Sequence, residues 1–420
     1  MKKLTVLILA LILAVNAGAA LAEPTVIDGL SPRNIKVHKA GLNPPADEMI
    51  AQGISPTTGR KLKEITCPEG FAGAAVTGTY QPIMVQTSNT KNGIGFSGNG
   101  KMYAVAPVNG SYADVVYEAS QVKGGSETRM SFVYSDTVPD YAGFLRSTRL
   151  THVRLRQEWN CAFCTSGYST ADVPGEWRKM GVLDPTHASD ENPGIVYIGD
   201  AGINKPWRKY VRRLKGVKRP NNELFELAKI VNEVIPADHV PANHTWKFTD
   251  ERPAGGDPAE IVWVTFGSKY DTDSRLEYDE QENAYIRYVA VANHQDMPYR
   301  ESVLVEPKDV NERKNGKLSL ETRVRERQPG NLITFSNVIV QGINMRWRKG
   351  RSRPDPVLTG TGNADYFMGG KHIAGVWERE NNDSRTVFYG PDGEEMTLQR
   401  GRTLIIVMDY EQENRFIAYN

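Results

Sequence analysis

Runs of β-branched and aromatic residues dominate the first half of the chain and predict strands. We expect strands over residues 81–89, 101–109, 128–136 and 192–200. The stretch 113–121 is apolar with two carboxylates among its residues, and this pattern fits either a strand or a short helix.

Two helices are expected in the same half, the second of them from apolar residues spaced three or four apart. One helix ends at about Trp159, and the other covers residues 222–235. Strands that alternate with helices are typical of an α/β domain, which we place at 60–237. The segment ahead of it, 23–59, is rich in Pro, Gly and polar residues and predicts a linker.

The pattern changes after residue 237. Residues 238–258 break the apolar rhythm with Pro, Gly and charge, and predict a second linker. From 259 to 420 nearly every apolar run has strand character, and the acidic sequence DEQEN between two such runs predicts a hairpin turn. The expected fold class is α+β, an N-terminal α/β domain followed by a mainly β C-terminal domain.

Residues 1–22 have the layout of a cleavable signal peptide. Two lysines precede the apolar run LTVLILALILAV, and the sequence ALA before Glu23 fits the small-x-small cleavage rule. The alternative is an uncleaved membrane anchor, for which the run is short. Because this segment has no cysteine, we expect an exported, extracytoplasmic protein that is not a lipoprotein.

The charge balance excludes one class of partner and leaves others open. The formal net charge is +1 and the charged fraction is 24%, which is unlike the strong basic excess of a nucleic-acid binder. Residues 205–219 nevertheless hold eight Lys or Arg and no acid. This run, like the second basic run at 345–353, is either a solvated surface or a contact for anionic wall polymer or membrane headgroups. An envelope protein is a further possible partner.

The chain has three cysteines, Cys67, Cys161 and Cys164, which allow at most one disulfide. In an exported protein we expect a structural disulfide; unpaired thiols and redox chemistry at the CAFC sequence are the alternatives. Since no second CxxC or HxxxH motif is present, we expect no metal site and no cofactor.

The sequence AGFLRSTR, residues 142–149, places two arginines at the start of a predicted helix. If Ser147 or Thr148 caps the helix, Arg146 lies just outside the first turn and Arg149 lies within it. The N-terminus of a helix carries about half a positive charge, so arginine is unfavourable there. A bound phosphate or carboxylate would reverse that sign.

Acidic partners for these arginines occur earlier in the chain. The arginines either hold an anion, lie on the surface, or form internal ion pairs with Asp114, Glu118 or Glu127. We predict an anion pocket made by Asp114, Tyr117, Glu118, Thr128, Arg129, Arg146, Ser147 and Arg149.

The same segments resemble the motifs of the YerB-like family of bacterial envelope proteins, whose members are often lipoproteins. That family's pattern is roughly A-D-[IV]-V-Y-E, G-G-x-T-R and G-x-x-R-S-x-R, and this chain has ADVVYE, GGSETR and GFLRSTR. TTGRKL, KRPNNELF and GPDGEEMTLQRGRT are similar to further landmarks. The chain departs by one extra residue between Gly125 and Thr128 and by Asn221, where histidine is common.

The resemblance implies a two-domain envelope protein but implies little chemistry, because the molecular function of the family is itself unsettled. We expect a protein that binds an anionic ligand or acts as a scaffold in cell-wall processes. The alternative is an enzyme that acts on a phosphorylated or carboxylated wall precursor. In that case Arg146 and Arg149 would hold the anion, and Asp114 or Glu118 would be the acid–base or metal-holding group.

Overall fold

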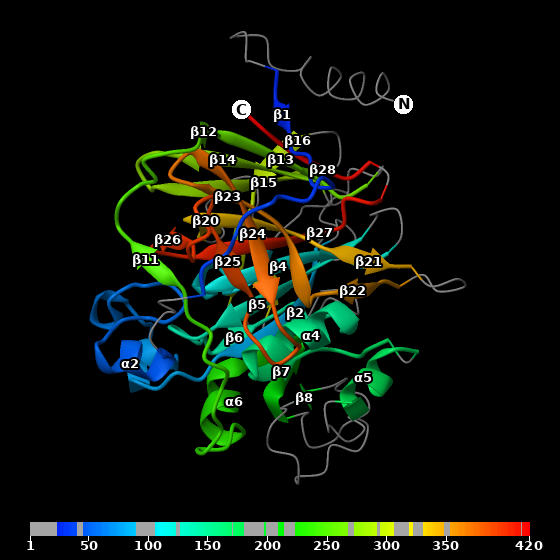
Figure 1. The fold of residues 1–420 in the computed structure, drawn as a ribbon. Coiled ribbons are helices and arrows are strands. Elements are labelled where there is room, and N and C mark those ends of the chain that lie inside the picture. The colour runs from blue at the N-terminus through cyan, green and yellow to red at the C-terminus, as the bar shows by residue number, and fades with distance from the viewer. Residues whose placement is uncertain are drawn as a thin grey trace.

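The computed structural model describes most of the chain after residue 22. The described ranges are 23–39, 45–89, 106–122, 127–169, 171–179, 197–198, 209–213, 223–267, 273–291, 295–305, 319–321, 331–347, 353–412 and 414–420. Within them two large sheets and a few short helices form a β-rich α+β fold (Figure 1).

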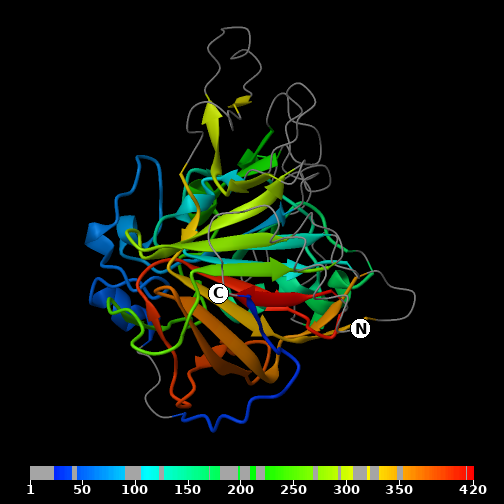
Figure 2. The ribbon, with the colours of Figure 1, turned by 90° about the horizontal axis from the view of Figure 1, so that it is seen from above.

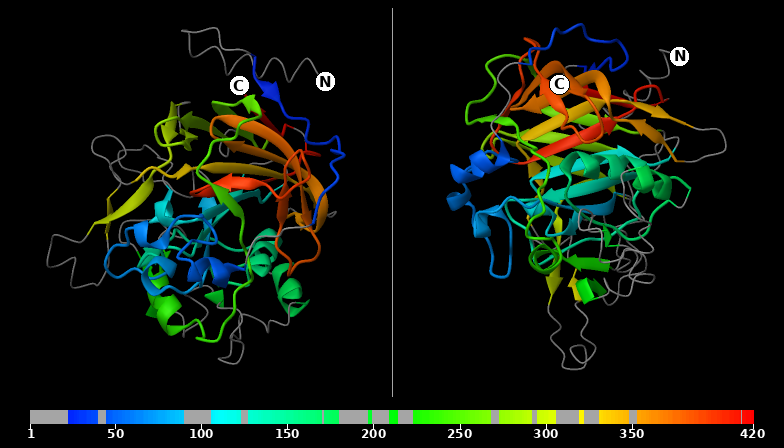
Figure 3. Two further views of the ribbon diagram at one scale, coloured as in Figure 1. Left: turned by 60° about the vertical axis from the view of Figure 1, so that its left-hand side comes forward. Right: turned by 60° about the horizontal axis from the view of Figure 1, so that its bottom comes forward.

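The larger sheet has eleven strands in the described ranges, in the order β12-β24-β23-β20-β27-β4-β5-β2-β7-β8, with β25 paired to β24. Its curved end is formed by β23 and β24, drawn in orange (Figure 3). The bounds are β2 (Ile83–Asn89), β4 (Val115–Ser120), β5 (Thr128–Tyr134), β7 (Ala162–Cys164), β8 (Tyr197–Ile198), β12 (Asp257–Pro258), β20 (Asn337–Gly342), β23 (Gly360–Met368), β24 (Lys371–Arg379), β25 (Val387–Tyr389) and β27 (Thr403–Met408).

The second sheet has seven strands in the described ranges, in the order β1-β28-β13-β14-β15-β16, with β19 paired to β15. Figure 2 shows this layer from above, with β13, β14 and β15 in green and yellow beside the red β28. The bounds are β1 (Thr25–Val26), β13 (Ile261–Thr265), β14 (Ser274–Asp279), β15 (Ala284–Val291), β16 (Gln295–Pro298), β19 (Thr334–Phe335) and β28 (Phe416–Tyr419).

Smaller elements complete the described fold. The remaining strands are β3 (Ala106–Val108), β6 (Tyr141–Ala142), β9 (Val211–Arg213), β10 (Glu223–Glu226), β11 (Lys247–Thr249), β17 (Glu301–Val305), β18 (Ser319–Glu321), β21 (Asn344–Arg346), β22 (Asp355–Val357) and β26 (Thr397–Gln399). The helices are α2 (Ala46–Ala51), α3 (Ala74–Thr77), α4 (Leu150–Trp159), α5 (Val173–Lys179), α6 (Leu227–Glu233) and the 3₁₀ turns η1 (Leu62–Glu64) and η2 (Gly110–Tyr112).

The large sheet joins the two regions that we expected to fold as successive domains. Strand β27 pairs in parallel with β4, with Thr403 opposite Val115, and pairs in parallel with β20 on its other edge. Strands from 60–237 and from 259–420 therefore lie side by side in one sheet. The segment 238–258 does not separate two sheets.

Alternation along the strands divides the core into two layers. Val115 and Tyr117 of β4 face helix α4 and contact a cluster that includes Trp159. Val116 faces the opposite way and belongs to the cluster shared with the seven-stranded sheet, which includes Tyr285 of β15. The large sheet is thus buried on both faces, which explains why β27 is apolar at every position after Thr403.

Several local predictions are confirmed. Strands occupy the described parts of 81–89, 101–109, 128–136 and 192–200, and 113–121 is a strand rather than a helix. The acidic turn DEQEN is confirmed as the tip of a hairpin, but the strand that precedes it is β14 and not the earlier β13.

Two other predictions are corrected. The helix expected over 222–235 is α6 only, because its first residues form β10 and pair with β6 and β9. Apolar spacing alone did not separate a buried strand from a buried helix. The described part of the predicted linker 23–59 contacts the sheets: β1 pairs with β28, and Arg33 binds Asp365 at 2.7 Å.

A buried ion pair connects the two sheets. Glu118 of β4 accepts a hydrogen bond from the Arg287 guanidinium of β15 at 2.9 Å, and both side chains are fully buried. Asn89 and Thr128 donate to the same carboxylate at 2.6 and 2.9 Å. Burial raises the pKa of Glu118, and Arg287 opposes that rise. The pair therefore fixes how the two sheets lie on each other.

We predict that Glu118→Leu lowers the free energy of unfolding by about 3 kcal/mol, because it leaves Arg287 buried without a counter-charge. Adding Arg287→Met should recover most of that loss, since an apolar pair of similar volume replaces a buried ion pair at little cost. Urea denaturation of both single variants and the double variant measures the coupling. Losses that simply add in the double variant would contradict the role given to the pair.

Candidate functional site

The eight predicted pocket residues do not meet in one pocket. Asp114 immediately precedes β4, whereas Arg129 of β5 pairs with Ala119 near the other end of that strand. The arginines follow β5 and surround the start of α4. Asp114 thus lies at the opposite end of β4 from the arginines, and Glu118 pairs with Arg287 on the other face of the sheet, so neither carboxylate pairs with them.

Asp114 is buried, and its carboxyl group is bound by backbone and side-chain groups of Ser135 and Asp136. Its Oδ2 accepts hydrogen bonds from the Ser135 N–H at 2.6 Å, the Ser135 hydroxyl at 2.7 Å and the Asp136 N–H at 2.9 Å. Burial, and then the nearby charge of Asp136, raises the pKa of Asp114 to about 8. At neutral pH these two coupled carboxyls retain a proton between them.

Three more predicted residues belong to the core. Tyr117 accepts a hydrogen bond from the Trp159 indole at 2.9 Å, on the α4 face of the sheet. Glu118 and Thr128 bind each other on the opposite face, where Arg287 completes the network. These side chains are fully engaged within the protein, so the ligand-binding role predicted for them is not supported by their contacts.

Helix α4 begins one residue later than expected, with Arg149 and not Ser147 or Thr148 at its N-cap. The Arg149 N–H donates to Nδ1 of His152 at 3.0 Å, so the side chain at position N3 accepts from the N-cap backbone as in the return half of a capping box. Since Nδ1 accepts this bond, neutral His152 carries its proton on Nε2. Burial, followed by the charges of Arg129 and Arg149, lowers the pKa of His152 well below its ordinary value.

The far end of α4 is anchored by charge. Glu158 binds Arg379 of β24 at 3.1 Å and His244 at 2.9 Å, and all three are buried. Burial opposes ionisation, but the Arg379 charge and the other partners lower the pKa of Glu158 to about 2. This fixed end holds the N-terminus of the helix in place against the sheet.

Four guanidinium groups gather around the start of α4. We call Arg129, Arg146, Arg149 and Arg353 the arginine cluster. Arg129 binds the Glu127 carboxylate at 2.7 Å and donates to the Ser147 carbonyl, and Arg353 lies 3.9 Å from the same carboxylate. Within the described residues, no other carboxylate forms an ion pair with the cluster, which therefore has an excess of positive charge.

Two members of the cluster are the least compensated. Burial, and then the charge of Arg129, lowers the pKa of Arg146 to about 10 and that of Arg149 to about 9. Among the described residues, the Arg149 guanidinium donates only to the neutral Thr148 carbonyl, at 2.8 Å. The side chain of Arg149 is 8% exposed, so little water offsets the missing counter-charge.

Buried donors in this region lack acceptors. In the described structure, Nε of Arg146, Nε of Arg149 and Nε2 of His152 are buried without a hydrogen-bond partner. All three atoms carry a proton, because guanidinium is always protonated and His152 accepts at Nδ1. Buried donors are nearly always satisfied in proteins. An anion with several acceptor oxygens matches such a set.

The predicted pocket left out His152, although helical spacing places it on one face with Arg149, and it left out Arg353. Arg353 closes the basic run 345–353, so the run itself was the available signal. His152 lies three residues after Arg149, at position N3, from which a side chain can accept a hydrogen bond from the N-cap backbone N–H. The spacing alone did not show that the histidine is an acceptor.

The cysteine prediction is wrong for the described structure. Cys67, Cys161 and Cys164 are all free thiols, and the last two are buried. Burial raises the pKa of Cys161 to about 12, so its thiol is not poised for redox chemistry. Among the described residues, no group of three His, Cys, Asp or Glu side chains could hold a metal ion.

The basic run 205–219 lies largely outside the described residues. In its described part, Arg212 and Arg213 form ion pairs with Glu226 and Glu223 of β10. A contact between this run and an anionic surface remains a prediction. None of the helices in the described ranges has the length and apolar character needed to cross a membrane.

Comparison with known proteins fits this architecture. Residues 102–236 match the N-terminal domain, and residues 311–405 the C-terminal domain, of a protein family of unknown function, DUF3048. The chain belongs to this family. Its fold is similar to the crystal structure of the YerB protein from Bacillus subtilis, with 17% identity and a TM-score of 0.55 over 84% of this chain and 96% of that one. No curated protein matches.

The family boundaries have a structural meaning. The N-terminal match contributes β4 and β5 to the large sheet, and the C-terminal match contributes β20, β23, β24 and the first half of β27. The expected YerB-like family is confirmed, and both of its parts are needed to complete the sheet.

The raised pKa of Asp114 predicts a pH-dependent stability. The folded state holds a proton at this carboxyl up to about pH 8, whereas the unfolded chain releases it near pH 4. The stability contributed by this proton is therefore complete below pH 4 and is lost as the pH rises to 8. Asp114→Asn should become more stable relative to the wild type across that interval, by at most about 1.4 kcal/mol per pH unit.

Chemical denaturation of both proteins at pH 5, 6.5 and 8 measures this effect. The variant Asp257→Asn is a matched control, because Asp257 lies in an exposed strand. A difference between wild type and Asp114→Asn that does not change with pH would show that Asp114 is already ionised in the folded protein.

Proposed function

We propose that this protein is an extracytoplasmic binding protein for an anionic ligand of the cell envelope, held by the arginine cluster. The observation that carries the proposal is the set of buried, protonated and unpartnered donors on Arg146, Arg149 and His152. Structural ion pairing would have placed carboxylates against these donors. Instead, Arg149 has only a neutral carbonyl as its acceptor among the described residues.

The charge at this site supports an anion of more than one negative charge. Four guanidinium groups act on each other with Glu127 as the carboxylate that opposes them. A phosphate or pyrophosphate supplies acceptor oxygens for several forks together and forms strong, charge-assisted hydrogen bonds. The start of α4 adds the favourable field of a helix N-terminus.

Binding is better supported than the enzymatic alternative. The carboxylates expected to act as acid and base are engaged elsewhere: Glu118 binds Arg287, and Asp114 lies beyond the far end of β4. Among the described residues, Glu127 is the carboxylate beside the cluster, and Arg129 lowers its pKa. A carboxylate that remains ionised is a poor proton donor.

We predict that pyrophosphate at millimolar concentration raises the melting temperature of the wild type and leaves that of Arg146→Gln/Arg149→Gln nearly unchanged. A hydrogen bond to a charged group contributes about 1.5 to 3 kcal/mol, so loss of each arginine should weaken binding about tenfold or more. Without ligand, the double variant should melt at or above the wild-type temperature. The substitutions remove buried guanidiniums that have no carboxylate partner.

Arg252→Gln is the control, because Arg252 forms an exposed pair with Glu280. Thermal shift and calorimetric titration at two salt concentrations complete the experiment, since screening should weaken a charge-driven complex. Equal pyrophosphate binding by the wild type and the double variant would refute the site. A double variant that is strongly destabilised without ligand would show that the arginines are structural.

A further inference from the structure

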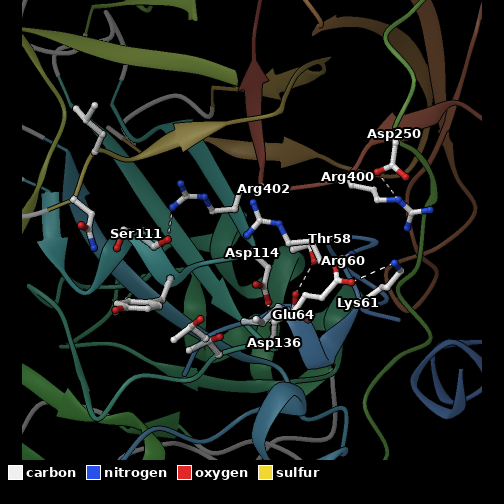
Figure 4. A pocket seen from close by; sticks show the side chains of 16 residues that line it. Thr58, Arg60, Lys61, Glu64, Ser111, Asp114, Asp136, Asp250, Arg400 and Arg402 are labelled. Atoms are coloured by element: carbon white, nitrogen blue, oxygen red, sulfur yellow. Dashed lines mark hydrogen bonds and ion pairs between the residues drawn. The ribbon is translucent and has the colours of Figure 1, made fainter. Parts of the chain in front are cut away.

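A cavity of about 710 Å³ lies at the opposite end of β4 from the arginine cluster. Three stretches that are far apart in sequence form its walls: residues 58–66, the carboxyls Asp114 and Asp136 that flank β4 and β5, and residues 400–402 before β27. Figure 4 shows that charged side chains from all three project into it. Its volume is in the range of small-molecule sites.

The charges at the edge of the cavity pair with each other. Lys61 lies 3.2 Å from Glu64, and Arg400 lies 2.8 Å from Asp250. Figure 4 shows these pairs at the side of the cavity. They have exposed members and are already compensated, so they form a rim and do not determine which ligand is bound.

Two further arginines lack a carboxylate partner. Arg402 donates to the Thr334 hydroxyl at 2.9 Å and to the Ser111 carbonyl, which are both neutral. Burial, and then the charge of Arg60, lowers the pKa of Arg402 to about 10. In the described structure no hydrogen bond or ion pair is seen for the Arg60 side chain, which also acts electrostatically on Asp136.

The floor of the cavity offers carboxyl groups. The Thr58 hydroxyl donates to Oδ2 of Asp136 at 2.6 Å, while the described hydrogen bonds to Asp114 all reach Oδ2. Oδ1 of Asp114, which lines the cavity, accepts no hydrogen bond from the described residues. Because the two coupled carboxyls retain a proton near neutral pH, the guanidinium charges of Arg60 and Arg402 exceed the carboxylate charge.

We infer that this cavity is a second binding site, for an acidic sugar whose anionic group binds Arg60 and Arg402 and whose hydroxyls bind Asp114 and Asp136. Guanidinium forks match a carboxylate or phosphate, and carboxyl oxygens accept from sugar hydroxyls. The inference goes beyond the proposed function, because it assigns a different ligand class to a different end of β4.

Calorimetric titration of Arg146→Gln/Arg149→Gln, in which the arginine cluster no longer competes for phosphate, tests the cavity with four probes: glucuronic acid, glucose 6-phosphate, glucose and inorganic phosphate. We expect both acidic sugars to bind, and glucose and phosphate to bind at least tenfold more weakly, since each lacks one of the two recognised features. Comparing the two acidic sugars shows whether the ligand's anion is a carboxylate or a phosphate. Phosphate that binds as tightly as glucose 6-phosphate would overturn the role of the carboxyls.

Arg60→Gln is the decisive variant, because the Arg60 side chain is exposed and forms no hydrogen bond or ion pair within the described structure. It should weaken acidic-sugar binding at least tenfold with an unchanged circular dichroism spectrum, whereas Arg149→Gln should leave that binding intact. The inference is overturned if Arg60→Gln binds like the wild type, or if Arg149→Gln removes binding. Pyrophosphate binding at the arginine cluster is scored separately, so either site can fail alone.

Discussion

The parallel pairing of β27 with β4 is the constraint on which the rest of this structure depends. It places a strand from near the C-terminus at the centre of a sheet begun by the first half of the chain. Parallel strands need long connections, so this pairing forms only when distant segments have found each other. Both candidate sites take their position from it, because they occupy the two ends of β4.

Buried charged side chains along β4 and beyond its end differ in whether they have a counter-charge. In the middle, Glu118 is buried against Arg287, and the pair joins the two sheets. At the start of α4, beyond the far end of the strand, Arg149 is nearly as well buried but has no carboxylate. The buried charge of Glu118 is thus neutralised by Arg287, whereas the buried charge of Arg149 at the start of α4 has no carboxylate partner among the described residues. That contrast is the physical reason to assign a ligand to the cluster.

Much of the fold could be predicted from local pattern, but its assembly could not. The strands at 81–89 and 128–136 and the end of α4 at Trp159 follow from apolar spacing. The pairing of β27 with β4 has no local signal, since period and composition do not encode which strands become neighbours. For the same reason the change in amino-acid composition at 238–258 did not indicate where the large sheet ends.

The basic half of the predicted site gathers at the start of α4, and its ligand-binding role stays a prediction. Positive charge at a helix start conflicts with the helix dipole, and that conflict is readable from AGFLRSTR. The prediction that residues of ADVVYE share one pocket required their side chains to point the same way. Adjacent residues of a strand face opposite ways, so Tyr117 and Glu118 enter different core layers. A linear motif such as ADVVYE therefore joined residues that the folded protein keeps apart.

The most direct test of this account is a crystal structure of the protein grown with tungstate, with anomalous data collected at the tungsten edge. The account predicts an anomalous peak within hydrogen-bond distance of the Arg146 and Arg149 guanidiniums, beside His152. It would be contradicted by a structure in which carboxylates of the chain occupy those donors and no peak lies at the cluster.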